Sequence, residues 1–145
     1  MNYDITDTMV RMAQDAMRNA HVEGDGIVGG ACALADDGTL YSGCTIEHVI
    51  PELSMSAETV ALVKAVSDGK RKFDAVAIIA DIAGGFYVPD EASCKFMAQF
   101  DVAEVVMSDI SGNIRVVKLE ELTPYKPRRR QYADDSFYDD DDYND

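Results

Sequence analysis

The sequence contains no tryptophan, only two histidines and only three cysteines, and its 13 Lys and Arg residues are outnumbered by 27 Asp and Glu. Two histidines, His21 and His48, are too few for a histidine-rich metal site. There is no Cys-x-x-Cys pair, and an odd number of cysteines in apolar segments favours reduced thiols in a cytoplasmic protein. The net charge of −14 argues against a nucleic-acid partner, because phosphate contacts require Lys and Arg.

Long hydrophobic runs are also missing from the sequence. No stretch approaches the roughly 20 apolar residues that a membrane helix needs, so we expect no membrane partner. The polar, acidic start of the chain lacks the basic and apolar regions of a secretory signal. A length of 145 residues with 47% hydrophobic side chains predicts one globular domain, which we assign to residues 1–127.

The last eighteen residues, 128–145, differ in composition from the rest. They hold seven Asp and three Arg, a net charge of −4, which leaves −10 of the total −14 on the preceding residues. Almost no aliphatic side chain is present to bury, so we expect a disordered acidic tail. The alternative is an interaction segment that a partner orders. Its aromatic anchors would be Tyr132, Phe137, Tyr138 and Tyr143.

Hydrophobic periodicity and turn residues predict an α/β fold with a mixed five-stranded sheet. An amphipathic pattern predicts the first helix, an Asp-Gly turn predicts a hairpin, and Gly69 is placed to end the second helix. The expected helices are residues 5–20, 56–67 and 91–99, and the expected strands are 27–35, 39–45, 73–81, 103–107 and 114–119.

Two short segments contain the sequence pattern on which our functional hypothesis depends. Ser56-Ala57-Glu58 is followed, 31 residues after the Glu, by Pro89-Asp90-Glu91-Ala92-Ser93. This spacing resembles that of the zinc-dependent nucleobase deaminases, which carry His/Cys-x-Glu on one helix and Pro-Cys-x-x-Cys at the start of the next. The three positions that bind zinc in those enzymes are occupied here by Ser56, Asp90 and Ser93.

Further matches in the same register, over residues 7–127, resemble the small homotetrameric cytidine deaminases. Ile27–Ala33 resembles their F-x-V-G-A-A-L strand, and 43–48 resembles their G-x-N-V-E-N loop. The stretch 66–69 resembles V-S-E-G, and 122–124 resembles L-L-P. The resemblance implies a three-layer α/β/α sandwich with helices on both faces of the sheet. It also implies a homotetramer whose pockets are completed by neighbouring subunits, with a pyrimidine nucleoside as ligand.

The resemblance also assigns roles to individual residues. Glu58 matches the proton shuttle, Glu47 the acceptor for the ribose hydroxyls, and Ile27 the phenylalanine that stacks on the base. The substrate-binding positions implied in this way are Ile27, Thr45, Glu47 and Ala57. For Glu47 the residues leave an alternative open, a loop carboxylate that caps backbone amides.

The three replaced positions predict that no zinc is bound and that no cofactor is needed. A serine hydroxyl stays protonated at neutral pH and is a poor zinc ligand, and one carboxylate does not replace the missing thiolates. Thr59 and Cys94 stand where the family has arginines beside its thiolates. We therefore predict a catalytically inactive pseudo-deaminase that binds a pyrimidine nucleoside or acts as a structural or regulatory subunit.

Several alternatives to this prediction stay open. The chain would be an active deaminase if Glu58 catalysed the reaction alone or with an unusual metal. It would be an interaction module if the acidic tail bound a partner. Oxygen ligands from Glu58, Asp90 and Glu91 would suit Mg²⁺ or Ca²⁺, and His48 with Cys94 would be substitute zinc ligands. Burial and the charge of Asp90 should raise the pKa of Glu58, which suits either a general acid or base or a static proton-sharing network.

Overall fold

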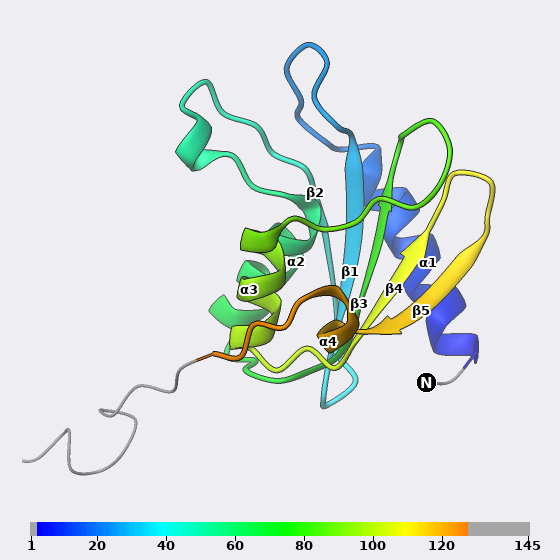
Figure 1. Ribbon diagram of the computed structural model, residues 1–145, viewed down its shortest axis with the longest axis vertical. Coiled ribbons are helices and arrows are strands. Elements are labelled where there is room, and N and C mark those ends of the chain that lie inside the picture. Colours follow the sequence, from blue (N-terminus) through cyan, green and yellow to red (C-terminus); the bar gives the residue numbers. More distant parts are fainter. Residues whose placement is uncertain (1–2, 128–145) are drawn as a thin grey trace, which may run out of the picture.

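The computed structural model describes residues 3–127, so the predicted acidic tail, 128–145, lies outside the described part of the chain. Ten short elements follow one another in the order that the sequence predicts, with a 3-10 turn and a last helix added (Figure 1). They are α1 Tyr3–Met17, β1 Gly29–Ala35, β2 Leu40–Cys44, η1 Pro51–Leu53, α2 Ala57–Ser67, β3 Phe73–Ala80, α3 Glu91–Gln99, β4 Glu104–Ser108, β5 Ile114–Lys118 and α4 Leu119–Leu122.

The five strands form one mixed sheet, as predicted, and their order in it is β2-β1-β3-β4-β5. β1 pairs antiparallel with both β2 and β3, β3 pairs parallel with β4, and β4 pairs antiparallel with β5. The one parallel pair requires a crossover, and the chain makes it through α3. The end of β2, the start of β1 and the end of β3 therefore meet at the same edge of the sheet, because Gly30 pairs with both Cys44 and Ile79.

Helices cover both faces of the sheet, which confirms the predicted three-layer sandwich (Figure 1). α1 packs on one face and buries Met9 and Ala13 against Cys32 and Leu34 of β1. α2 and α3 pack on the other face, with Leu62 among the fully buried side chains there. Successive residues of a strand point to opposite faces, so β1, buried at all seven positions, contributes to both cores.

Two glycines allow the helices to approach the sheet closely. A Cβ atom added to Gly30 would overlap the backbone carbonyl oxygen of Ala13 in α1. One added to Gly43 would overlap the backbone of Ala61 in α2. Glycine, which has no side chain, permits this close approach of two backbones.

The boundaries differ from the predicted ones at a few places. α1 ends at Met17 rather than at residue 20, and β1 begins at Gly29 rather than at Ile27. Ile27 lies before the strand with 45% of its surface exposed, because the pairing of β1 with β3 starts at Gly29. Gly69 has φ +97° immediately after the last residues of α2, which confirms its predicted role as a helix terminator. Within residues 3–127, no helix has the length and apolar composition needed to span a bilayer.

Candidate functional site

Loops at one edge of the sheet surround an open cavity of about 440 Å³. Figure 1 shows these loops, before β1, between β2 and α2, and between β3 and α3, projecting from the same end of the molecule. Seven of the eight residues singled out from the sequence line the cavity, and the eighth, Ser93, is hydrogen-bonded to one of them. Those seven are Ile27, Thr45, Glu47, Ser56, Ala57, Glu58 and Asp90.

The three positions that correspond to zinc ligands in the deaminases lie together at the N-termini of α2 and α3. Ser56 is the N-cap of α2, and its Oγ accepts a hydrogen bond from the Thr59 amide at 3.3 Å. Asp90 is the N-cap of α3, and its Oδ1 accepts from the Ser93 amide at 2.8 Å. The hydroxyls of Ser56 and Ser93 are 3.0 Å apart, and Ser56 also donates to Thr59 Oγ1 at 2.9 Å. All three side chains are thus engaged in capping the helices and linking them.

Glu58 is the buried acid of the site, with 1% of its surface exposed. Burial raises its pKa; its own amide and the hydroxyls of Ser93 and Ser56 act in the opposite direction, and the charge of Asp90 raises the pKa further. This agrees with the direction expected from the sequence. The serine contacts fit the static network considered above, but Glu58 Oε2 has no hydrogen-bond partner among residues 3–127. The carboxyl group is therefore only partly satisfied by the protein.

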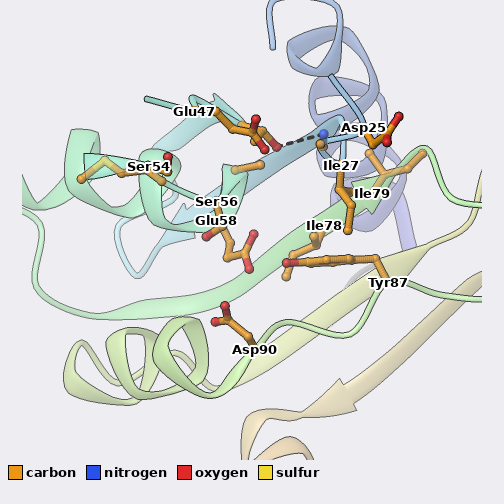
Figure 2. Close-up of a pocket in the computed structure, with 15 residues that line it drawn as sticks. Asp25, Ile27, Glu47, Ser54, Ser56, Glu58, Ile78, Ile79, Tyr87 and Asp90 are labelled. Atoms are coloured by element: carbon orange, nitrogen blue, oxygen red, sulfur yellow. Dashed lines mark hydrogen bonds between the residues drawn. The ribbon is translucent and has the colours of Figure 1, made fainter. Parts of the chain in front are cut away.

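At the outer part of the cavity, two predicted binding residues also contact the backbone. Glu47 Oε1 accepts a hydrogen bond from the Glu23 amide at 2.8 Å, and a Cβ atom at Gly26 would overlap the Glu47 carboxylate. Thr45 Oγ1 accepts from the Gly29 amide at 3.0 Å (Figure 2). Glu47 therefore does cap a backbone amide, as the alternative interpretation expected. Its second oxygen, Oε2, accepts no hydrogen bond in the described structure.

Tyr87 lines the cavity and was not singled out from the sequence. It follows two glycines in the loop before α3, where no hydrophobic periodicity marks it. Burial raises its pKa, and the charges of Glu58 and Asp90 add to the effect, so the phenol keeps its proton at neutral pH. Figure 2 shows the Glu58 carboxyl group, the Asp90 carboxylate and the Tyr87 ring around the same inner space.

The charges around the cavity are all of one sign. Its lining includes four acidic residues, Asp25, Glu47, Glu58 and Asp90, and among the described lining residues there is no Lys, Arg or His. Apolar side chains, including Ile27, Met55, Ile78 and Ile79, form much of the remaining wall. The arrangement suits an uncharged or cationic ligand with one flat apolar face and several hydrogen-bond donors.

The alternative metal ligands considered from the sequence are engaged elsewhere. His48 Nδ1 accepts a hydrogen bond from the Ile50 amide at 2.9 Å. Cys94 is buried, its Sγ lies 3.7 Å from the Pro89 carbonyl oxygen, and burial raises its pKa to about 11. In the described residues, no group of three or more His, Cys, Asp or Glu side chains is arranged to hold a metal ion. All three cysteines are free thiols, as expected.

Comparison with known proteins identifies relatives of similar length, although no family model matches the chain. The sequence is 34% identical to a cytidine deaminase of Sporosarcina psychrophila over 118 residues, which are 80% of this chain and 86% of the relative. It is 32% identical to a cytidine deaminase of Halalkalibacterium halodurans over 119 residues, 80% of this chain and 89% of the relative.

Solved structures agree with these sequence relatives. A cytidine deaminase from Burkholderia pseudomallei superposes with a TM-score of 0.78 and 26% identity, over 88% of this chain and all of the other. A cytidine deaminase from Mycobacterium tuberculosis gives a TM-score of 0.70 at 24% identity, over 85% of this chain and 97% of the other, which supports the fold alone. With sequence identity above 30% over most of two relatives, and with the same sandwich, the chain belongs to the cytidine deaminase family.

Proposed function

We propose that this chain is a pseudo-deaminase: it holds no zinc, does not deaminate cytidine, and binds a pyrimidine nucleoside in the cavity beside Glu58. The observation that carries the proposal is the hydrogen bonding of Ser56, Asp90 and Ser93. In the family, zinc supplies an activated water at these positions. Here the side chains cap two helices instead.

The Ser56 hydroxyl is already engaged in hydrogen bonds within the protein. It contacts Thr59 Oγ1, the Thr59 amide and the Ser93 hydroxyl. Asp90 accepts from the Ser93 amide. The donor set is one carboxylate and two neutral hydroxyls, whereas a zinc site needs thiolate, imidazole or several carboxylates. This donor set does not fit zinc.

Binding of a nucleoside is supported by the size and chemistry of the cavity. Its volume of about 440 Å³ falls within the range of small-molecule sites. Ile27 and Ile78 offer apolar surface to a base, and the free oxygen of Glu47 and the hydroxyl of Thr45 offer polar contacts to a sugar. Ala57, at the start of α2, adds a small side chain that leaves room for the ring.

A homotetrameric assembly is proposed from the family resemblance and is supported by an exposed apolar loop beside the cavity. In the connection between β2 and α2, several large apolar side chains are exposed, with Val49 at 83% and Leu53 at 57%. Monomeric proteins rarely leave such clusters uncovered. A second copy that covers this loop would lie at the cavity mouth. Light scattering at micromolar concentration tests the assembly, and a monomer would contradict it.

The second candidate is an active deaminase or other hydrolase that uses Glu58. It is favoured by one observation, a buried carboxyl group with raised pKa in a cavity, which is the environment of many general acids and bases. Without an activated water, however, Glu58 has no nucleophile to assist. The candidate therefore requires a metal that the present side chains are poorly suited to hold.

One set of measurements separates the two candidates. Elemental analysis of the purified, untagged chain should give close to zero zinc per mole of chain. A cytidine deamination assay should show no turnover above a chelated control, and calorimetry should detect cytidine binding. One zinc per chain together with turnover would refute the pseudo-deaminase proposal.

A further inference from the structure

We propose that Asp90 makes the cavity selective for a cytosine-type base over a uracil-type base, because its carboxylate accepts a hydrogen bond from the exocyclic amine of the base. The inference rests on the proposed nucleoside binding and adds to it a specificity-determining residue. In effect, the chain would distinguish the substrate of deamination from its product. Three observations carry the argument.

The first observation is the unsatisfied oxygen of Glu58. The side chain is 1% exposed and lines the cavity, and its Oε2 has no hydrogen-bond partner among the described residues. A buried polar atom without a partner is costly, so a ligand that supplies the missing bond is favoured. The atom marks the inner end of the cavity as a place where a polar edge of the ligand should lie.

The second observation is the position and fixation of Asp90. Its carboxylate lines the same cavity, and its charge acts on Glu58, so the two groups are near neighbours (Figure 2). Oδ1 is held by the Ser93 amide at 2.8 Å, which fixes the side chain at the start of α3. The capping bond leaves the second oxygen, Oδ2, to accept a bond from a ligand.

The third observation is that the described residues place no cationic side chain in the lining. Four carboxyl groups line the cavity, and no Lys, Arg or His stands among its described lining residues. In the described part of the chain, no charged donor is therefore placed to neutralise Asp90 or to donate to a keto oxygen. The hydroxyl groups of the inner part belong to Ser56, which is already hydrogen-bonded to Thr59 and Ser93, and to Tyr87, and both are neutral donors.

The edges of the two bases differ in a way that Asp90 can detect. Cytosine presents an exocyclic amine, a donor, beside a ring nitrogen that accepts; uracil presents a keto oxygen, an acceptor, beside a ring N–H that donates. A carboxyl group such as Glu58 can face either ring nitrogen, since it donates when protonated and accepts when ionised. Asp90 cannot adapt in this way: it accepts from the amine and repels the keto oxygen. Selectivity therefore falls on Asp90 rather than on Glu58.

The magnitude follows from the exposure of Asp90. A site that buries a hydrogen-bonding group completely can discriminate by several orders of magnitude, but Asp90 is solvent-exposed, so part of the penalty is screened. We expect cytidine to bind at least about tenfold more tightly than uridine.

The test measures dissociation constants for cytidine and uridine by calorimetry, in the full chain and in two variants. Asp90→Asn and Asp90→Ser both keep a good N-cap for α3, so the fold should survive. In Asp90→Asn, which can donate to a keto oxygen, the uridine-to-cytidine ratio of dissociation constants should fall from at least ten to about one. Asp90→Ser should lower the ratio too. Asp81→Asn, an exposed acid at the end of β3 that does not line the cavity, should leave the ratio unchanged.

The outcomes distinguish a failure of the proposed selectivity from a failure of the proposed nucleoside binding. Equal binding of both nucleosides by the unaltered chain would refute the selectivity while leaving nucleoside binding intact. A ratio above ten that persists in both Asp90 variants would assign selectivity to another group and would also refute the inference. Binding of neither nucleoside would refute the proposed function itself, and the inference with it.

Discussion

Replacing Glu58 by glutamine should stabilise the protein, and the gain should grow with pH. Glu58 is almost completely buried, and one of its oxygens has no hydrogen-bond partner in the described structure. Glutamine has nearly the same shape and never ionises. The substitution therefore removes the cost of keeping an acid in a poorly solvated place while disturbing the packing of α2 as little as any change can.

The sign of the pH dependence follows from the pKa of Glu58, which burial raises above its ordinary value of 4.5. The folded protein then holds the proton more tightly than the unfolded chain does. The wild-type protein consequently keeps its full stability below about pH 4.5 and loses some as the pH rises towards the folded-state pKa. The desolvation of the ionised carboxylate, which lacks one of its hydrogen bonds, sets the scale, about 1–3 kcal/mol. Glu58→Gln should thus gain about 1–3 kcal/mol at pH 8 and little at pH 4.

Urea denaturation at several pH values between 4 and 8 measures this difference directly. The corresponding shift in melting temperature at pH 8 should be about 2–10 °C for a chain of this size. Glu52→Gln is the matched control: Glu52 is exposed in η1, and its replacement should change stability by less than about 0.5 kcal/mol. A difference between Glu58→Gln and the wild type that stays constant from pH 4 to pH 8 would refute the reasoning.

Three further predictions follow from the same geometry. Changing Ser56, Asp90 and Ser93 together to cysteine should restore zinc to about one ion per chain by elemental analysis; a zinc-free triple variant would show that donor chemistry alone does not decide metal binding. Gly30→Ala should destabilise the protein by about 1–3 kcal/mol in urea, because its methyl group would overlap the Ala13 carbonyl oxygen; an unchanged midpoint would contradict the tight packing of α1. Cytidine 5′-monophosphate should bind at least about tenfold more weakly than cytidine in a competition assay, since the cavity lining has four acids and no base among its described residues; equal binding would contradict the electrostatic argument.

The sequence predicted the architecture well because the architecture depends on local patterns. The hairpin follows from the turn at 36–38, and the end of α2 follows from Gly69, whose positive φ needs no side-chain context. The buried strand β3 follows from its continuous apolar run. α4 was missed because four residues, Leu119–Leu122, are too few to show a helical period.

The composition of the cavity was predicted where a motif marks a residue and missed where tertiary contacts alone place it. Glu58 and Asp90 stand at fixed positions in the deaminase pattern, so their convergence could be expected. Tyr87 and Asp25 come from loops without periodicity, and only the fold brings them to the same cavity. The bond between the Glu23 amide and Glu47 joins residues 24 positions apart, a distance over which local sequence patterns carry no signal.

The caps at the starts of α2 and α3 also affect how the protein responds to its surroundings. A fold completed by a bound ion gains stability according to the free concentration of that ion, by mass action. Ser56 and Asp90 belong to the polypeptide. The bonds that they accept from the Thr59 and Ser93 amides therefore form whenever the helices form, at any concentration of metal ion. The contribution of these two helix N-termini to the free energy of folding is therefore independent of the free metal-ion concentration.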